Sequence, residues 1–150
     1  MALGTKLRWK AHIKKKNEEL RLKYQKMYWL IGRHSQMSIS NKLLLYKQIL
    51  KPVWTYGIQL WGCSRQSNIQ IIQRFQNKVL RSIVDAPWYT RNSDLHKDLK
   101  ADSVVEEIEK SAKSHQTRLE AHTNVEALQL LDNLNIVRRL KRTKPFELVK

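Results

Sequence analysis

Residues 51–63, KPVWTYGIQLWGC, decide the fold of this chain. The stretch holds three large aromatic residues, Trp54, Tyr56 and Trp61. Aromatic residues are frequent in β-strands, and in a basic protein they also suit a surface on which bases stack. A strand, a stacking surface and the core-facing side of a helix are therefore all open, and the surrounding residues must distinguish them.

The apolar residues around this stretch recur with helical spacing. Successive members of the series lie three or four positions apart, which places them on one side of a helix. The series is Ile39, Leu43, Tyr46, Leu50, Trp54, Gly57 and Trp61. Pro52 removes one helical hydrogen bond, so we expect a kink near Lys51–Pro52, or two helices that meet there. Gly57, on the buried side, would let a neighbouring helix approach closely. A strand over residues 53–61 is the alternative.

Residues 8–31 show the same period. Their apolar side is formed by Trp9, Ile13, Leu20, Tyr24, Met27 and Ile31. Lysine and arginine residues occupy the other sides, and Gly32 is suited to end the helix. The pattern predicts one long helix whose aromatic residues, Trp9 and Tyr24, belong to the core. Ser38 or Ser40 is suited to begin the next helix.

Residues 67–85 form the most regular amphipathic segment. Ser67 and Gln70 have the spacing of a capping box, and Asp85 marks the end because Ala86 precedes Pro87. The apolar side is Ile69, Ile72, Phe75, Gln76, Val79, Leu80 and Ile83. The opposite side is Gln70, Gln73, Arg74, Asn77, Lys78 and Arg81. This polar side has no acid, so it offers donors to phosphate oxygens; an exposed side without a partner is the alternative.

Shorter helical patterns follow a loop over residues 86–92. Asn92 or Ser93 begins a short helix, and Asp102 or Ser103 caps a longer one. The apolar series of the longer helix is Val105, Ile108, Ala112, His115, Leu119 and His122. Asn124 ends this pattern, Ala127, Leu128 and Leu131 make a last amphipathic turn, and residues 137–150 form a basic tail. The sequence thus predicts an all-α fold, an irregular bundle of about five helices with a basic C-terminal tail.

Composition and charge limit the classes of function. The chain has 150 residues, of which 41% are hydrophobic, and only 4 glycines and 3 prolines. Its single cysteine excludes a disulfide framework and predicts an intracellular, reducing compartment, nuclear or cytoplasmic. No apolar run reaches the length of a membrane span, about 20 residues.

The net charge of +16 is unevenly distributed. Residues 1–51 contain 13 Lys and Arg against two acids, for +11, whereas residues 52–100 carry +4 and residues 101–150 carry +1. Such a field attracts polyanions, of which nucleic acid is the usual one. An anionic membrane surface and an incidentally basic protein are the alternatives.

The sequence lacks the residue patterns of a catalytic centre. The five histidines have no metal-binding spacing, and one cysteine cannot build a thiolate site. Asp94, Asp98 and Asp102 share a spacing of four, but acids are also favoured where helices begin. There is neither a glycine-rich phosphate loop nor a nucleophile elbow. We therefore predict no catalytic residue, no metal site, no cofactor and no small-molecule ligand.

Several stretches in this order are similar to one polymerase family. They are LGTKLRWKAHI (3–13), KLLLYKQILKPVWTYGIQLWGCS (42–64), SNIQIIQRFQNKVLRSIVDAPWYTRN (67–92), LHKDL (95–99) and RLEAHTN (118–124). They resemble the C-terminal part of reverse transcriptases of jockey-type non-LTR retrotransposons. The resemblance implies a thumb-like helical region (1–90), a post-thumb helical extension (91–136) and the basic tail (137–150). In that family the thumb holds the primer–template duplex.

Two departures from the family bear on activity. The catalytic palm of the family uses an Asp-Asp pair, and this sequence contains none. His122-Thr123-Asn124 stands where the family often has His-Pro-Asn. The resemblance therefore implies a truncated, non-catalytic C-terminal fragment of an RNA-directed DNA polymerase, inactive alone, whose partners would be an RNA or DNA duplex and the missing palm.

We predict that the chain binds the nucleic-acid backbone without sequence specificity. From their helix faces alone, the candidate contacts are Lys14, Lys15, Arg21, Arg74, Lys78 and Arg81. The alternatives are a free-standing basic helical binding module with a cellular role and a peripheral membrane binder. The membrane hypothesis requires the aromatic residues Trp9, Tyr24, Trp54 and Trp61 to face lipid.

Overall fold

The structure, a computed structural model, describes residues 9–126, which form helices and contain no strand. The first half holds α1 (Trp9–Lys26), α2 (Tyr28–Ile31), α3 (Ile39–Leu45), a π-helical turn η1 (Tyr46–Leu50), α4 (Lys51–Thr55) and α5 (Ile58–Trp61). The second half holds α6 (Gln66–Val84), α7 (Asn92–Asp98) and α8 (Val104–Glu120). The predicted all-α class is confirmed.

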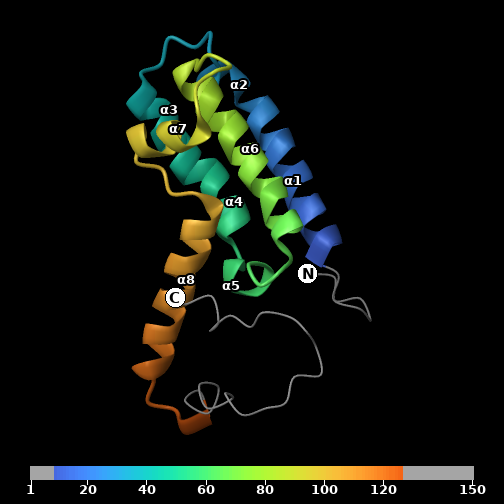
Figure 1. Cartoon of the computed structure of the whole chain (residues 1–150), viewed down its shortest axis with the longest axis vertical. Helices are drawn as coiled ribbons and strands as arrows, with labels where there is room; N and C mark the ends of the chain where they lie inside the picture. The colour runs from blue at the N-terminus through green and yellow to red at the C-terminus, as the bar shows by residue number, and fades with distance from the viewer. Residues whose placement is uncertain (1–8, 127–150) are drawn as a thin grey trace.

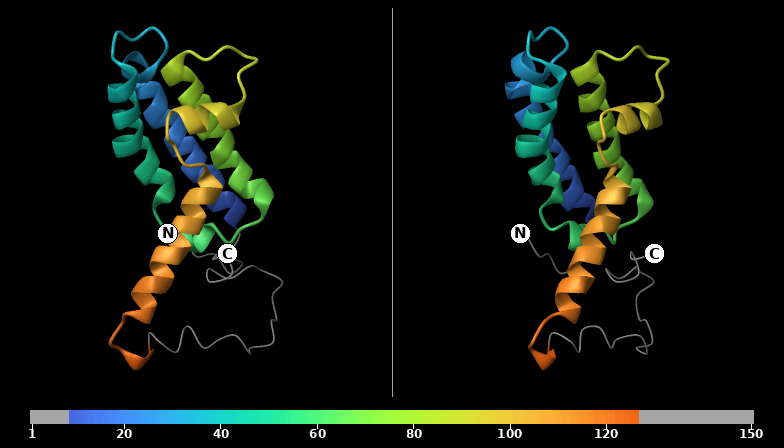
Figure 2. Two further views of the ribbon diagram at one scale, coloured as in Figure 1. Left: turned by 60° about the vertical axis from the view of Figure 1, so that its left-hand side comes forward. Right: turned by 90° about the vertical axis from the view of Figure 1, so that its left-hand side faces the viewer.

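Three rods of helix form the centre of the bundle (Figure 1). α1 and α6 lie side by side, and the continuous rod of α3, η1 and α4 packs against both. α8 packs on α5 and α6, and its C-terminal end extends beyond the bundle (Figure 2). The short α7 lies on α6.

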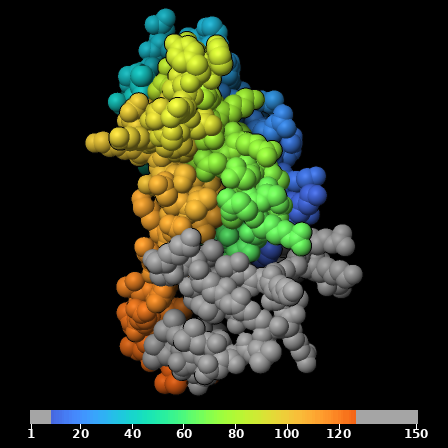
Figure 3. Space-filling view, viewed as in Figure 1, coloured from blue at the N-terminus to red at the C-terminus, as the bar shows by residue number. Residues whose placement is uncertain are grey.

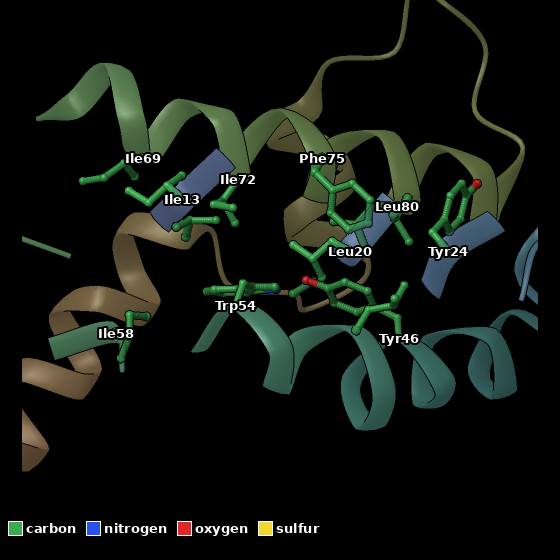
Figure 4. Close-up of a cluster of buried hydrophobic side chains, with 14 of the residues drawn as sticks. Ile13, Leu20, Tyr24, Tyr46, Trp54, Ile58, Ile69, Ile72, Phe75 and Leu80 are labelled. Atoms are coloured by element: carbon green, nitrogen blue, oxygen red, sulfur yellow. The ribbon is translucent and has the colours of Figure 1, made fainter. Parts of the chain in front are cut away.

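The core lies between these three rods (Figure 4). α1 contributes Ile13, Leu20 and Tyr24, and α6 contributes Ile69, Ile72, Phe75, Val79, Leu80 and Ile83. The middle rod and α5 add Tyr46, Leu50, Trp54, Ile58 and Trp61, and α8 adds Val104 and Ile108. Trp54 and Trp61 are both 0% exposed, so two of the three aromatic residues of the deciding stretch are core residues.

The buried side of α6 agrees with the sequence prediction at every position: Ile69, Ile72, Phe75, Gln76, Val79, Leu80 and Ile83. The helix ends at Asp85, which has a left-handed backbone. Its start was predicted wrongly, because Arg65 occupies the N-cap position and makes no side-chain capping bond. Ser67 therefore lies inside the first turn, and it does not cap the helix.

The first helix is interrupted, whereas the sequence predicted one helix to residue 31. A turn at Met27 separates α1 from α2, and the Met27 amide is shared between the carbonyls of Lys23 and Tyr24. Gly32 does end α2, as expected. Tyr24 is buried and Trp9 half-buried against the core.

The deciding stretch is helical, and two helical elements, η1 and α4, meet at Lys51 as one of the two expectations had it, but the chain turns elsewhere. Pro52 occupies the first turn of α4, directly after the π-helical turn, and the rod continues through it. In the π-helical turn the Lys51 amide donates to the Tyr46 carbonyl, five positions back along the chain. The chain instead changes direction at Tyr56–Gly57, where Gly57 has φ +67°. Consequently the Tyr56 side chain is 81% exposed, although Trp54, two positions before it, and Trp61, five positions after it, are buried.

Two further expectations for this rod are corrected. Ile39 is 50% exposed, so the buried side of the rod begins later than the spacing indicated. Gly57 does not permit a close helix approach, because a Cβ there would have no neighbour within 4 Å. The close approach occurs at Gly62, where a Cβ would lie 3.0 Å from Ile108 Cγ2 of α8.

Gly57→Ala is expected to destabilise the protein by about 1–2 kcal/mol, the cost of a left-handed backbone at a residue with a Cβ. The cost is conformational, because the added methyl group meets nothing within 4 Å. Gly57→Asn is the control, since asparagine tolerates this conformation better. Urea unfolding of the variants checks this: alanine and asparagine variants that both match the wild type would contradict the left-handed turn.

Buried polar side chains satisfy the backbone where the rods end. Lys16 of α1 is 7% exposed, and its Nζ donates to the carbonyls of Val53 at 2.8 Å and Tyr56 at 2.9 Å. Lys42 is 4% exposed and donates to the Gly32 carbonyl at 2.9 Å. Helix ends need such partners because their last carbonyls lack intrahelical donors. The apolar spacing did not identify either lysine.

α8 begins with a complete capping box. The Ser103 hydroxyl accepts from the Glu106 amide, and the Glu106 carboxylate accepts from the Ser103 amide at 2.7 Å. These hydrogen bonds lower the pKa of Glu106. Ser103 was one of the two predicted caps, but the buried valine is Val104, while Val105 is 37% exposed. Lys51 bonds Glu107 at 2.9 Å and ties α4 to α8.

The structure bears on the membrane hypothesis. Tyr24, Trp54 and Trp61 are buried, so three of the four aromatic residues that would have faced lipid lie inside the protein. No helix within residues 9–126 is long and apolar enough to span a membrane. The predicted turn at Ala127, Leu128 and Leu131 and the basic tail (137–150) lie outside the described residues.

Candidate nucleic-acid interface

A broad groove of about 1310 Å³ runs between α1 and α6. Its lining includes Tyr24 and Phe75, which are both buried and pack edge to face at 6.1 Å. Burial raises the pKa of the Tyr24 hydroxyl above its usual value. Figure 3 shows α6 at the surface between α1 on one side and α7 and α8 on the other. The groove thus has an aromatic floor and an open face.

Four of the six candidate residues line this groove. Arg21 lies on α1, and Arg74, Lys78 and Arg81 lie on α6. Arg21, Arg74 and Lys78 have exposed side chains. Because α1 and α6 pack side by side, residues more than 50 positions apart in the sequence form one basic surface. We call Arg21, Arg74 and Lys78 the basic row.

The other two candidates, Lys14 and Lys15, do not line the groove. Lys14 lies two turns before Arg21 on the same side of α1, so it extends the basic row toward the start of the helix. Lys15 is turned about 100° further round the helix and points away from α6. Both side chains are exposed.

Arg81 is already engaged within the chain. Its Nε donates to Asn92 Oδ1 at 3.0 Å and its Nη1 to the Pro87 carbonyl at 3.1 Å, while Nη2 donates to the Thr90 carbonyl. These bonds hold the loop between α6 and α7 against the end of α6. Arg81 adds positive charge to the groove, but the orientation of its guanidinium group is fixed by its hydrogen bonds to the loop.

Gln73 and Asn77 of α6 are engaged within the chain, contrary to the expectation that they offer donors to phosphate. Gln73 Nε2 donates to Asn77 Oδ1 at 2.9 Å, and Gln73 Oε1 accepts from the Val104 amide at 2.8 Å. His96 of α7 lies 2.9 Å from the same Asn77 oxygen. Gln76, which is buried, donates to the Asp102 carbonyl at 2.7 Å. Gln73, Gln76 and Asn77 therefore attach α7 and α8 to α6, and of these three only Asn77 also lines the groove.

Sequence reasoning missed three residues of the groove: Arg33, Tyr28 and Trp88. Arg33 lies 3.5 Å from Asp85 in an exposed ion pair that joins the chain after α2 to the end of α6. Asp85 is the one acid among the lining residues, against five arginines and lysines. Arg33 and Trp88 lie in loops, where no periodic pattern exists to indicate a direction.

The aspartates considered for metal binding do not converge. Asp102 pairs with Lys110 at 2.6 Å, which lowers the Asp102 pKa, and Asp94 lies in the first turn of α7. Within residues 9–126 no three His, Cys, Asp or Glu side chains group as metal ligands. The chemical features of the groove are therefore its positive charge and its aromatic side chains.

The fold and the groove place this chain among basic, all-helical proteins. Its homologues are RNA-directed DNA polymerases of Drosophila transposons. It is 43% identical over 147 residues to a probable RNA-directed DNA polymerase from transposon X-element of Drosophila melanogaster, covering 98% of the chain and 16% of the relative. It is 35% identical over 142 residues to the probable polymerase from transposon BS, covering 95% of the chain and 16% of that relative. It is also 33% identical over 156 residues to the polymerase from mobile element jockey, covering 99% of the chain and 17% of the relative.

These relatives confirm the resemblance to jockey-type reverse transcriptases. The chain spans about a sixth of the length of the curated relatives it matches, 16% for the X-element and BS polymerases. No protein-family model matches the chain. No solved structure matches it.

Proposed function

We propose that this segment of an RNA-directed DNA polymerase binds the nucleic-acid backbone through the groove between α1 and α6. The observation that supports this is the basic row, in which Arg21, Arg74 and Lys78 lie exposed along one groove. Arginine and lysine contacts to phosphate fix the position of a nucleic acid without reading its sequence. Binding of this kind suits a polymerase that must pass along any template.

The segment holds no catalytic carboxylates in this proposal. The resemblance implies that the polymerase active site uses an Asp-Asp pair, which is absent from the 150 residues. The function of residues 1–90 would then be that of a thumb, with residues 91–136 as an extension and residues 137–150 as a basic tail. The partners would be an RNA or DNA duplex and the palm of the parent polymerase.

A matched pair of double variants tests the basic row. Arg74→Ala with Lys78→Ala removes two charges from the groove, and Lys113→Ala with Arg118→Ala removes the same two charges from exposed positions of α8. Each phosphate contact contributes about 0.9 to the log–log salt slope on B-form duplex. We expect the groove variant to weaken binding and to lower the slope by about 1.8, while the α8 variant stays near the wild type.

Fluorescence anisotropy of a labelled 20-base-pair duplex between about 0.05 and 0.2 M salt measures both quantities. Equal losses in the two variants would show attraction by net charge alone and would contradict the groove. Affinity that does not change with salt would contradict backbone binding altogether.

A further inference from the structure

The loop between α6 and α7 presents two aromatic side chains to solvent. Trp88 is 91% exposed and Tyr89 is 71% exposed. Their rings pack against each other edge to face at 5.9 Å. Aromatic side chains usually bury most of their surface, so an adjacent exposed pair in a folded protein indicates a binding surface.

The loop is held in place on both sides of this pair. The Thr90 amide donates to the Pro87 carbonyl at 3.1 Å, which makes Trp88 and Tyr89 the central residues of a tight turn. The Arg81 guanidinium bonds the same two positions, through the carbonyls of Pro87 and Thr90. An arginine from α6 therefore fixes the backbone on either side of the aromatic pair, and the exposure of the pair is built into the fold.

Trp88 also lines the groove that contains the basic row. The turn follows the C-terminal end of α6 (Figures 1 and 2). The single acid of the lining, Asp85, is paired with Arg33. The surroundings of Trp88 are thus cationic, and they complement a polyanion that carries flat apolar groups.

We propose that Trp88, supported by Tyr89, stacks on an unpaired base of a single-stranded nucleic acid whose phosphates follow Arg21, Arg74 and Lys78. This inference rests on the proposed function and adds a single strand, beside the duplex, as a ligand of the basic row. Positively charged grooves with aromatic side chains bind single strands without sequence preference, because every base has a π-face. In a duplex the bases stack on one another and their faces are inaccessible to a side chain.

The charge of the groove argues against a protein segment as the occupant. An apolar protein partner that filled the groove would have to desolvate the arginine and lysine side chains that line it together with Trp88, which is costly without opposite charges. A nucleic-acid strand supplies one negative charge per nucleotide together with an apolar base face. Such a strand would bind both the positive charge of the groove and the exposed aromatic ring of Trp88.

Single substitutions at exposed aromatic positions test the proposal with the full chain. Trp88→Ala is compared with Trp29→Ala, which removes another tryptophan that is 74% exposed and does not line the groove. The probes are a 12-nucleotide single-stranded DNA, the same strand with abasic sites throughout, and a blunt duplex. We expect Trp88→Ala to weaken binding of the normal strand about five-fold to a hundred-fold. It should leave the abasic strand and the duplex within about two-fold, and Trp29→Ala should change none of the three.

The outcomes separate this inference from the proposed function. Loss of binding on Arg74→Ala with Lys78→Ala, but no effect of Trp88→Ala on the normal strand, would overturn the stacking site and leave the basic row intact. An equal effect of Trp88→Ala on the normal and abasic strands would also overturn stacking, because the phosphates alone would account for it. If Trp88→Ala changed only the self-association of the chain, the pair would be a protein contact and the proposal would be wrong.

Discussion

Trp54→Ala is expected to lower the free energy of unfolding by about 3–5 kcal/mol, the cost typical of removing a buried aromatic side chain. Trp54 is 0% exposed and lies at the centre of the core, between the side chains of α1 and α6 (Figure 4). Because domains are stable by only about 5–15 kcal/mol, this loss would remove a large share of the stability of the fold.

Tyr56→Ala is the matched control for this variant. It removes an aromatic side chain two positions away that is 81% exposed and whose ring centroid lies 5.3 Å from Lys16 Nζ, and we expect a change of about 1 kcal/mol or less. Trp54→Phe separates packing from the indole N–H, which makes no geometrically adequate hydrogen bond within the described residues. Urea denaturation followed by circular dichroism measures all three. Equal stabilities of Trp54→Ala and Tyr56→Ala would contradict the burial of Trp54.

The sequence predicted the helical rods because their apolar spacing repeats over many turns. Every buried position of α6 follows from its 3.6-residue period. The deciding stretch shows where such reasoning fails. Its apolar series passes through Gly57 with helical spacing, yet a single left-handed residue turns the chain there. The spacing of apolar residues does not distinguish one continuous helix from two helices joined by a one-residue turn. In both cases the apolar residues reach the same core.

The candidate site was predicted in part, for a similar reason. Helix faces were sufficient to select Arg21, Arg74 and Lys78, which line one groove in the structure. They were insufficient for Gln73 and Asn77, because these amides bind His96 and Val104, which lie further along the chain. Whether a polar face meets solvent or another element depends on the packing of α7 and α8. The aromatic residues of the loop lie outside any periodic pattern, and only the three-dimensional arrangement places Trp88 at the groove.

Lys16 illustrates a polar residue whose burial is decided by distant backbone. Its ammonium group reaches from α1 to the carbonyls of Val53 and Tyr56, 37 and 40 residues away. Burial lowers the pKa of Lys16, so this charge is held in the interior at a cost. The two carbonyls lack a backbone hydrogen-bond donor because α4 ends at the Gly57 turn. Buried carbonyls require a donor, which explains the lysine in the core.

Lys16→Met is therefore expected to lower the free energy of unfolding by about 2–6 kcal/mol, since two partly buried carbonyls lose their donor at about 1–3 kcal/mol each. Methionine retains an apolar stem of similar length, so the loss reports hydrogen bonding more than packing. Lys15→Met is the control: it removes the same charge from an exposed neighbour on the same helix and should change stability by about 0.5 kcal/mol or less.

Chemical denaturation of the two variants under the same conditions gives the difference directly. A Lys16→Met protein as stable as Lys15→Met would show that water, and not this ammonium group, satisfies the end of α4. In that case the turn at Gly57 would be held by its glycine alone, and Gly57→Ala would carry the larger cost of the two. If Lys16→Met is the more damaging change, the orientation of α5, and with it the burial of Trp61, depends on a hydrogen-bonded lysine from the first helix.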